Sequence, residues 1–382
     1  MGLAAGSIAS LEQRFLPLIT SRGLQLPNEL APLTAVRPTA LEPRTRFSLF
    51  DLPTLVNWPY DGSAAGSGHY ITLGNVHTID PETSAANCGI YRCQIHGPQS
   101  MAIRWKRGSG AEQHLQRYRA LQKPMPISIT MGVPPALTLC AAWPVPDTID
   151  EIHLAGWLQG RPVERYPCSH GPILVPSDSE VVLEGFVDLH EELPEGPFGN
   201  FRGSYDPSGA AAKITITAWY QRTPFYMPAT VVGPPPQEDC LMMRGWERFL
   251  AATLAGCIEG FYDISLPAAW VFNKGIVLAL KEPTAQRAKD AIQKLWDTAW
   301  FKDARLILVV DSSVNIHDNQ ILLWQMAQGT GLWGSRLLVH ADGMRLGIDA
   351  TETRVSLQET ITTTKRLANW QKEFCSNDRD LS

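Results

Sequence analysis

Between residues 54 and 225 the chain consists of short β-forming runs that are separated by turns rich in Gly and Pro. Apolar and polar residues alternate in HYITLGNVHTID (69–80), which favours a strand. Many short strands joined by tight turns are typical of a β-barrel or a β-sandwich. Two short helices, predicted over 111–122 and 150–160, would be insertions between the strands. The runs that carry this prediction include HYITLGNVHTID, CGIYRCQIHG, SMAIRWKRG, EVVLEGFVDL and KITITAWYQR.

From about residue 226 the pattern changes to an alternation of helices and strands. Helices are expected over 240–256 and 284–300, and ARLILVVDSS (304–313) is an almost continuous apolar run, typical of a strand buried on both faces. This half is therefore predicted to be α/β. The predicted domains are a Pro-rich arm with one short helix (1–53), a β-rich domain (54–225), an α/β domain (226–350), and a helix with a polar tail (351–382).

Composition excludes several classes of protein. The 382 residues carry 33 Lys and Arg against 38 Asp and Glu, so the net charge is −5 and no basic surplus points to nucleic acid. The longest apolar runs are too short to predict a membrane span, and the N-terminus lacks the basic start of a signal peptide. The seven cysteines are scattered without CxxC spacing, which is typical of free thiols in a reducing compartment. We therefore expect a cytoplasmic protein that binds neither nucleic acid nor membrane.

A carboxylate, Glu195, stands in the turn PEGPFGN (194–200), directly after a β-run. Gly allows a close approach of the backbone to a ligand, and Pro stiffens the loop. These properties suit a binding or catalytic carboxylate. An ordinary hairpin turn with a solvated Glu would show the same pattern, so the residues alone leave both interpretations open.

An arginine follows the run NCGI (87–90) at Arg92. In a strand, alternation would place Gly89 and Tyr91 on one face, and Cys88, Ile90 and Arg92 on the other. A buried Arg needs a partner, and a carboxylate is the natural one because the pairing is bidentate. An exposed Arg on the solvent face of the strand is the alternative.

Other motifs are less specific. Asp150 and Glu151 begin a predicted helix, where acids also serve simply to offset the helix dipole. Polar residues follow the strand in VVDSSVNIHD (309–318), which is where α/β sheets often place their sites, although a satisfied loop explains them equally. No P-loop or HExxH pattern occurs, so neither a P-loop nucleotide site nor a zinc hydrolase is predicted.

Several short blocks, taken together and in order, resemble the UbiD family, whose members are decarboxylases, some reversible, that use prenylated FMN. The resemblance runs from about residue 51 to about residue 353. Each block alone is weak, but their number and order make the match specific. The blocks are LPTLVNWPYDG, YITLGNVHTIDPETSAANCGIYR, VPPAL, AAWPVPD, VPSDSEVVLEGFV, PEGPFGNFRGSY, VVGPPPQED, DISLP, LILVVDSSVNIHD and GIDAT.

The resemblance implies an α/β (α+β) fold, with a flavin-binding split β-barrel domain over 54–225 and a C-terminal α/β domain over 226–350. Family members usually carry an N-terminal α/β domain before the WPxDG block, whereas only about 50 residues precede WPYDG in this sequence. The resemblance therefore implies that this domain is reduced to an arm. A shortened N-terminal side should leave apolar surface uncovered, from which we expect a homodimer or a higher oligomer.

The resemblance also implies roles for residues around the cofactor. Asn87 and Glu151 align with ligands of a divalent cation, manganese or magnesium, beside the flavin phosphate, where oxygen ligands are usual. Backbone carbonyls near Cys88 and Trp143 align with potassium ligands. Ile90 aligns with a cofactor-binding position.

Three further positions align with the chemistry of the family. Arg92 and Glu195 align with two members of a Glu-Arg-Glu/Asp catalytic network, which agrees with the expectation that Arg92 pairs with a carboxylate. Both would position substrate and cofactor. Arg345 aligns with a Lys that contacts the flavin phosphate, a task that Arg performs bidentately.

The sequence departs from the family at two positions. The second acid of the network, which protonates the product, is replaced by Asn200, and an amide is no general acid at neutral pH; losing such a group costs roughly 10²–10⁴ in rate. We therefore expect an atypical protonation. The His ligand of the divalent cation aligns best with Lys106, whose ammonium is predicted to meet the phosphate in place of the ion. A solvated Lys without a role is the alternative.

The sequence thus predicts a decarboxylase that depends on prenylated FMN and acts on an aromatic or α,β-unsaturated carboxylic acid. As in some members of the family, the reaction could also run in the direction of carboxylation. A flavin prenyltransferase would supply the cofactor. Trp143, Phe198 and the stretch 323–335, with Trp324 and Trp333, are predicted to line the substrate pocket. The alternative is an altered or non-catalytic UbiD-like subunit of a larger complex.

Overall fold

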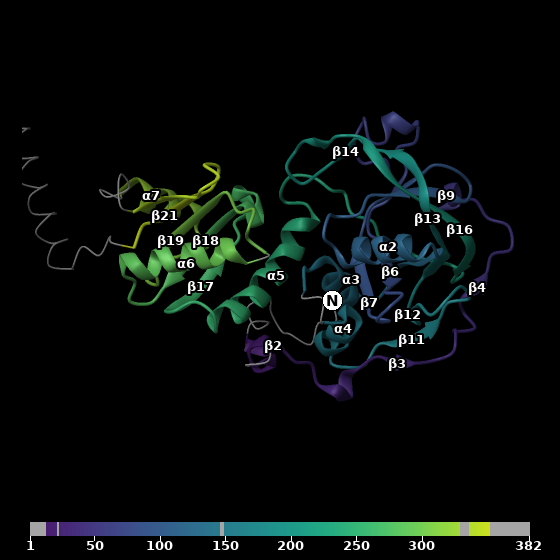
Figure 1. The fold of residues 1–382 in the computed structure, drawn as a ribbon, viewed down its shortest axis with the longest axis horizontal. Helices are drawn as coiled ribbons and strands as arrows, with labels where there is room; N and C mark the ends of the chain where they lie inside the picture. Colours follow the sequence, from purple (N-terminus) through teal and green to yellow (C-terminus); the bar gives the residue numbers. More distant parts are fainter. Residues whose placement is uncertain (1–12, 21–22, 146–148, 299, 329–335, 352–382) are drawn as a thin grey trace, which may run out of the picture. The chain divides into compact units, whose positions relative to one another are not determined.

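The chain forms two compact units, residues 1–253 and residues 254–382. The computed structural model describes residues 13–20, 23–145, 149–298, 300–328 and 336–351. The first unit is organised around a large antiparallel sheet, and the second around a smaller, mainly parallel one (Figure 1).

The first unit is built on a nine-stranded sheet in the order β5-β8-β9-β16-β13-β10-β6-β7, with β4 paired to β16. Its long strands β13 (Val181–Glu195) and β16 (Gly209–Gln221) run side by side along one side of the unit (Figure 1). Their register shifts twice, and such irregularities bend and twist a sheet. The other strands are β4 (Glu42–Pro43), β5 (Tyr70–Ile71), β6 (Asn75–Ile79), β7 (Ala86–Ile90), β8 (Cys93–Ile95), β9 (Ser100–Ile103) and β10 (Met125–Met131).

Both faces of this sheet are covered, which explains why strands such as β10 are buried along their whole length. Ile127 and Ile129 of β10, Leu183 of β13 and Ile214 of β16 share one apolar cluster. The two isoleucines of β10 are two residues apart, as expected for one face of a pleated sheet. A second cluster on Val182 and Tyr220 packs against the small sheet of β11 (Glu164–Pro167), β12 (Leu174–Pro176) and β3 (Leu33–Thr34).

Three helices interrupt the strands of the first unit. Helix α2 (Gly110–Leu121) begins after Ser109, whose hydroxyl accepts from the Glu112 N–H, and it packs on the sheet through Leu115 and Tyr118. Helix α3 (Pro135–Ala142) and helix α4 (Glu151–Gln159) pack on each other and on β7. Asp150 caps α4 by accepting from the Ile152 and His153 N–H groups. The two helices predicted from sequence are thus present as α2 and α4.

The arm before the sheet is anchored to it. Phe15 is fully buried against Trp143, Trp157 and Phe249, while β3 and β4 each add a short strand to a sheet of the first unit. The helix predicted over 11–23 is shorter in the structure: residues 13–15 are helical and the 3₁₀ turn η1 (Leu16–Leu18) follows. Pro17 in that turn lacks the N–H that would extend the helix.

The second unit holds a five-stranded sheet in the order β17-β18-β19-β21-β20. Strands β18 (Gly275–Leu280), β19 (Leu306–Asp311) and β21 (Leu346–Asp349) are parallel, and β17 (Phe261–Ser265) and β20 (Leu337–Val339) flank them antiparallel. Helix α6 (Ala285–Asp297) buries Ala288, Ile292 and Leu295 on one face, as its spacing predicts. Helix α7 (Asn319–Gln328) follows β19.

The mixed α/β fold predicted from sequence is therefore confirmed: a half-barrel sheet and a C-terminal α/β unit. The units separate within helix α5 (Glu238–Ala255). The domain boundary near 225 remains a prediction, as does the tail over 351–382, which lies almost entirely outside the described residues.

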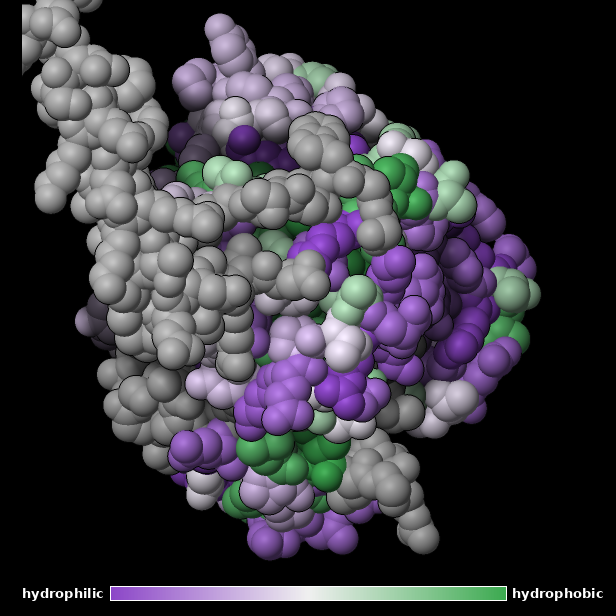
Figure 2. Space-filling model, turned by 90° about the vertical axis from the view of Figure 1, so that its left-hand side faces the viewer, coloured by the Kyte–Doolittle hydropathy of each residue, from purple (hydrophilic) through white to green (hydrophobic). Residues whose placement is uncertain are grey.

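Among the described helices, none combines the length and the apolar character that crossing a lipid bilayer requires. Figure 2 shows one face of the molecule, on which hydrophilic residues predominate and hydrophobic residues gather in small groups. The larger exposed side chains include Leu323 and Trp324 of α7. Scattered exposed apolar residues of this kind are normal for a folded domain.

Candidate functional site

A fully buried carboxylate, Glu195, ends strand β13 and meets Arg92 from the β7–β8 connection. Arg92 Nε lies 2.8 Å from Glu195 Oε1, and Arg92 Nη2 lies 3.1 Å from Oε2, which is a bidentate pair. The chain turns immediately after Glu195 at Gly196, whose φ of +91° favours glycine. The structure thus brings together the two residues that the sequence singled out separately.

A second guanidinium, Arg104, contacts the same carboxylate. Arg104 Nε lies 2.7 Å from Glu195 Oε2, and its Nη2 donates to the Glu195 carbonyl at 3.2 Å. Gly209, opposite Glu195 in the β13–β16 pairing, leaves room for it, because a Cβ there would lie 2.9 Å from Arg104 Nη2. Sequence reasoning missed Arg104, since only the pairing of β9, β16 and β13 brings it to Glu195.

The Tyr70 hydroxyl completes the surroundings of Glu195. It lies 3.3 Å from Glu195 Oε1 and 3.0 Å from Gln94 Oε1. Burial, followed by the negative charge of Glu195, raises the pKa of Tyr70 well above its usual value. Tyr70 is therefore a neutral hydrogen-bond donor to Glu195.

A second carboxylate, Asp206, lies on the other side of Arg92. Its Oδ2 is 2.8 Å from Arg92 Nη1, while its Oδ1 accepts from Asn200 Nδ2 at 2.8 Å and from Arg202 Nη2 at 2.7 Å. Burial pushes the pKa of Asp206 upward, but the hydrogen bonds and charges of Arg92, together with Asn200 and Arg202, outweigh it. The pKa of Asp206 therefore lies below its usual value.

A short hairpin places Asn200 and Asp206 beside each other. Strand β14 (Phe198–Gly199) pairs with β15 (Tyr205–Asp206), so that Phe198 lies opposite Asp206. Asn200 occupies the turn, buried, and its Oδ1 accepts from the Arg202 N–H at 2.8 Å. Asn200 is thus held at both ends of its amide and reaches Arg92 only through Asp206. Nothing in local sequence spacing pointed to Asp206; the hairpin register does.

Aromatic rings surround these charges. The guanidinium of Arg92 lies over the Phe198 ring at 4.6 Å, and Phe198 packs against Tyr70 with ring centroids 4.7 Å apart. Trp58 packs edge-on against Tyr205, the neighbour of Asp206. The Arg92 guanidinium thus lies against buried aromatic rings, which stabilise a cation. The predicted pocket residue Phe198 is therefore beside Arg92.

The predicted phosphate-side residues gather around β7. The Cys88 N–H donates to Glu151 Oε2 at 3.1 Å, which links β7 to the start of α4. Burial, then the charge of Glu151, raises the pKa of the Cys88 thiol. Asn87 Nδ2 is buried without a hydrogen-bond partner of ordinary geometry among the described residues, and a Cβ on Gly110 would lie 2.5 Å from Asn87 Oδ1. The start of α2 thus approaches Asn87 closely.

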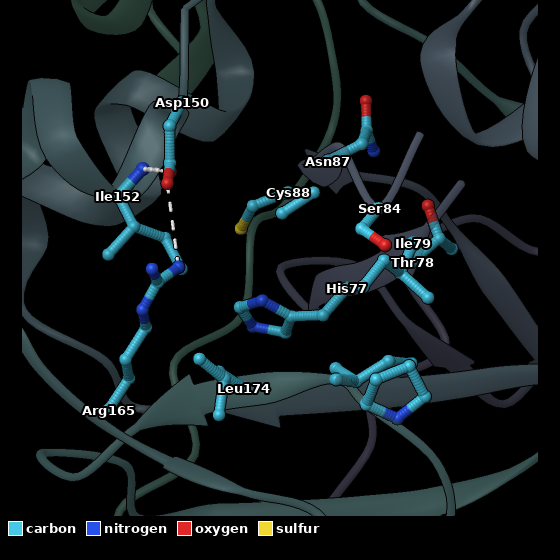
Figure 3. A pocket seen from close by; sticks show the side chains of 13 residues that line it. His77, Thr78, Ile79, Ser84, Asn87, Cys88, Asp150, Ile152, Arg165 and Leu174 are labelled. Carbon is cyan, nitrogen blue, oxygen red and sulfur yellow. Dashed lines mark hydrogen bonds and ion pairs between the residues drawn. The ribbon is translucent and has the colours of Figure 1, made fainter. Parts of the chain in front are cut away.

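A cavity of about 190 Å³ opens beside Asn87 and Cys88 (Figure 3). The Arg165 guanidinium and the Asp150 carboxylate form a 3.4 Å ion pair at its wall. His77 also lines it, and burial, then the charge of Arg165, lowers the pKa of His77 to about 3. His77 is therefore neutral at physiological pH. The lining residues are His77, Thr78, Ile79, Ser84, Ala86, Asn87, Cys88, Asp150, Ile152, Arg165, Pro172, Ile173 and Leu174.

Other predicted residues lie apart from this cluster. Trp143 is buried against Phe15 and Phe249, and its carbonyl accepts from the Val145 N–H at 2.9 Å. Ile90 ends β7, half-buried, opposite Asn75. Lys106 is exposed in the turn before α2.

The remaining predictions concern the second unit. Arg345 pairs there with Asp342, with Nε 2.6 Å from Oδ2, and lies over Trp296. Trp324 is 64% exposed, while residues 329–335 of the predicted stretch, including Trp333, lie outside the described residues. Among the residues that the structure describes, no group of three or more His, Cys, Asp and Glu side chains could hold a metal ion.

The half-barrel, the α/β unit and the Arg92 cluster define a class of protein that comparison with known families identifies. The family model described as the 3-octaprenyl-4-hydroxybenzoate carboxy-lyase Rift-related domain (UbiD) matches residues 34–235, more than half of the chain. The corresponding C-terminal domain matches residues 240–331. The chain belongs to the UbiD family.

Relatives of known sequence agree. An uncharacterized protein of Archaeoglobus fulgidus is 32% identical over 279 residues, which are 72% of this chain and 57% of that protein. An uncharacterized protein of Aquifex aeolicus is also 32% identical over 279 residues, 72% of this chain and 56% of that protein. The chain spans about half the length of the curated relatives it matches.

Solved structures share the fold. The UbiD-class enzyme HmfF from Pelotomaculum thermopropionicum, in an evolved dimeric form in complex with prFMN, superposes with a TM-score of 0.78 at 21% identity, covering 91% of this chain and 80% of that one. The closed form of the vanillic acid decarboxylase of Sedimentibacter hydroxybenzoicus gives a TM-score of 0.78 at 23% identity, covering 94% and 81%. At these identities the likeness concerns the fold.

Proposed function

We propose that this chain is a prenylated-FMN-dependent carboxy-lyase that removes carbon dioxide from an aromatic or α,β-unsaturated carboxylic acid. The observation that carries the proposal is Arg92, whose guanidinium joins the Glu195 and Asp206 carboxylates beside the Phe198 ring. The solved HmfF structure is a complex with prFMN, which supports this cofactor for a chain of the same family and fold. A flavin prenyltransferase would supply it.

The residues around β7 fit the phosphate end of a flavin. Asn87 Nδ2 is a buried donor to which the described part of the chain offers no acceptor of ordinary geometry, and the twelve-residue helix α2 begins beside it, where a helix favours an anion. Asn87 and Arg92 are five residues apart, which spans at most about 17 Å of extended chain. The phosphate end and the acid cluster would therefore be served by one segment of chain. When bound, a prenylated flavin supplies the sink for the electron pair that carbon dioxide leaves behind.

The side chains of the cluster would bind and orient the substrate. Arg92 retains its positive charge between two carboxylates: burial alone would lower its pKa, but Glu195 and then Asp206 raise it. Glu195, held by Arg92 and Arg104, fixes the direction of the guanidinium. Phe198 and Tyr70 would exclude water from the reacting carbon, which strengthens these electrostatic interactions.

The ions predicted at the phosphate remain proposals. Asn87 and Glu151 would hold a divalent cation, manganese or magnesium, unless the Lys106 ammonium meets the phosphate instead, and the carbonyls near Cys88 and Trp143 would hold potassium. Metal analysis of protein carrying flavin separates the two arrangements. Stoichiometric manganese would contradict the Lys106 proposal, and its absence together with a weakened flavin affinity in Lys106→Met would support it.

The assembly of this chain into a homodimer or a higher oligomer is likewise proposed. The evolved HmfF of the solved structure is dimeric, which supports a dimer for this chain as well. Light scattering on the purified holoprotein tests the proposal, and a mass of one chain, about 42 kDa, would contradict it.

The proposed reaction is tested with protein co-expressed with a flavin prenyltransferase. Carbon dioxide release is measured across benzoic, hydroxybenzoic, furoic and cinnamic acids. We expect turnover of at least one acid, and a loss of at least about 10²-fold in Arg92→Met, since this variant removes the shared cation. Bound prenylated flavin without any release or exchange of carbon dioxide would contradict the proposal.

The second candidate is a non-catalytic UbiD-like subunit of a larger complex. The observation that favours it is Asn200, which cannot act as the acid that the family places there. The ultraviolet-visible spectrum of the co-expressed protein separates the two functions. Protein that takes up no flavin would support the subunit, whereas a flavin spectrum with turnover would exclude it.

A further inference from the structure

Arg92 holds two carboxylates that differ in their surroundings. Glu195 has no exposed surface, whereas the side chain of Asp206 is 28% exposed. Glu195 contacts two guanidinium groups, those of Arg92 and Arg104, and the Tyr70 hydroxyl. Of the two carboxylates, Asp206 alone combines contact with Arg92 and access to solvent, and a group that exchanges protons in each turnover needs both.

The residue at position 200 cannot perform this exchange. Asn200 is buried, its amide nitrogen donates to Asp206, and its amide oxygen accepts from the Arg202 N–H. An amide has no acidic proton to give at neutral pH. Its position is instead that of a group that orients Asp206.

We propose that Asp206 is the proton carrier of this chain, with Asn200 and Arg202 as its positioning residues. The inference rests on the proposed decarboxylation. The bond between the reacting carbon and the carboxylate carbon breaks, carbon dioxide leaves, and the electron pair of that bond remains on the substrate side, where the bound cofactor would act as its sink until the reacting carbon is protonated. The neutral Asp206 carboxyl then gives its proton to that carbon, a C–H bond forms, and the Asp206 carboxylate is reprotonated from solvent.

The charges around Asp206 show how it would gain a proton. Arg92 and Arg202 contact Asp206 directly. Two further carboxylates lie near Arg92: Glu195 pairs with it, and Asp61 interacts with the charges of both Arg92 and Glu195. In the free protein the two arginines favour the carboxylate. A substrate carboxylate that pairs with Arg92 adds a negative charge and competes for the guanidinium, and both effects favour protonated Asp206. Substrate binding should therefore take up a proton.

The decisive variants exchange the amide and the carboxylate between neighbouring positions. In holoprotein, Asp206→Asn should lower decarboxylation by about 10²–10⁴-fold, the usual worth of a positioned acid. The double variant Asn200→Asp with Asp206→Asn still has one amide and one carboxylate at positions 200 and 206, but in exchanged places. Its rate of decarboxylation should be at least tenfold higher than that of Asp206→Asn. Asp178→Asn, which removes an exposed partner of Arg161, is the matched control and should match the wild type.

Three readouts keep a structural effect apart from a chemical one. The flavin spectrum and the melting temperature report cofactor and fold. In Asp206→Asn the spectrum should be unchanged, and the melting temperature should fall by no more than a few degrees, because only the ion pair with Arg92 and the bonds to Asn200 and Arg202 are weakened. The pH dependence of kcat should lose one ionisation in Asp206→Asn and regain it in the double variant. Asp206→Asn activity within threefold of the wild type would overturn the inference and leave the proposed decarboxylation standing.

A binding measurement tests Asp206 independently of turnover. Calorimetry of benzoate binding in buffers of different ionisation enthalpy counts the protons taken up. We expect uptake by the wild type and none by Asp206→Asn. Equal uptake by both proteins, benzoate binding without uptake, or no benzoate binding would overturn the role of Asp206, whereas turnover by the wild type tests the decarboxylation itself.

Discussion

Single residues in this chain act through partners that lie far from them in sequence. Arg92 meets Glu195 and Asp206, which are more than 100 positions away, and Arg104, which directly follows β9, also reaches Glu195. Each contact is short because a buried or half-buried charge is stable only when it is paired and hydrogen-bonded. The charge states of the site residues therefore depend on these ion pairs, and two predictions concern single titratable residues.

Asp206 should make the free energy of unfolding depend on pH in the acidic range. Its pKa is lower in the folded protein than in the unfolded chain, so the folded state gains stability above the unfolded pKa of about 3.9. This stability should be lost as the pH falls through the folded pKa. We expect the difference in unfolding free energy between wild type and Asp206→Asn to be constant from about pH 5 to 7 and to shrink below about pH 4, as measured by urea unfolding. A difference that grew toward acid would contradict this assignment.

His77 should affect the free energy of unfolding over a higher pH range than Asp206 does. Its folded pKa of about 3 lies below the unfolded value of 6.5, so the unfolded chain takes up a proton first as the pH falls. Stability should therefore fall between pH 6.5 and pH 3, by up to about 1.4 kcal/mol per pH unit. His77→Gln can still hydrogen-bond Thr130 and should flatten this part of the profile in urea unfolding. An unchanged slope would show that His77 is not the titrating group.

Secondary-structure elements bring the site residues to one place by their register. The β14–β15 hairpin sets Asp206 opposite Phe198, the β13–β16 pairing sets Gly209 opposite Glu195, and α2 begins against Asn87. Glycine stands where a polar side chain comes closest to the backbone. A Cβ at Gly209 would meet Arg104, and a Cβ at Gly110 would meet Asn87. The elements therefore decide how close the charged groups come.

Gly110→Ala tests the approach of α2 to Asn87. Its Cβ would lie 2.5 Å from Asn87 Oδ1, so Asn87 or the helix start must move. We expect the flavin affinity to fall at least tenfold while the melting temperature changes by only a few degrees. Gly256→Ala, where a Cβ would meet nothing within 4 Å, is the control. Flavin affinity equal in Gly110→Ala and wild type, measured by fluorescence titration, would show that Asn87 does not serve the cofactor.

At the scale of the whole molecule, the first unit depends on its N-terminal arm. Phe15 contacts Trp143, Trp157 and Phe249, and thereby connects the arm with α3, α4 and α5. The arm also contributes edge strands to two sheets. A segment that is poor in regular structure is thus held by a few large apolar contacts.

Phe15→Ala should destabilise the first unit by about 3–5 kcal/mol, because it leaves a cavity among three aromatic rings. Denaturant unfolding followed by Trp fluorescence measures the change. The neighbouring Leu16→Ala, at a side chain that is 44% exposed, should change stability by less than about 1 kcal/mol. Equal effects of the two variants would show that the arm is not held through Phe15.

Much of the fold and part of the site were predictable from the chain alone. The short β-runs of the first unit, the amphipathic spacing of α6 and the apolar run of β19 each follow from local burial, which leaves a trace in the sequence. Arg92 and Glu195 were candidates from their residue types and settings, which left an ordinary role open, and the resemblance to the UbiD family singled them out. Local patterns did not reveal Arg104, Asp206 or the anchoring by Phe15.

The roles of Arg104, Asp206 and Phe15 could be recognised only in the tertiary structure, and for the same physical reason in each case. Each acts through a contact across strands or between arm and sheet, and such contacts have no fixed spacing along the chain. Position 200 shows the difference most clearly. Its amide is plain in the sequence and argues against an acid there, but only the hairpin shows Asp206 bonded to that amide and to Arg92. The sequence determined that position 200 carries an amide and not an acid, and the register of the hairpin decided that the Asp206 carboxylate lies between this amide and Arg92.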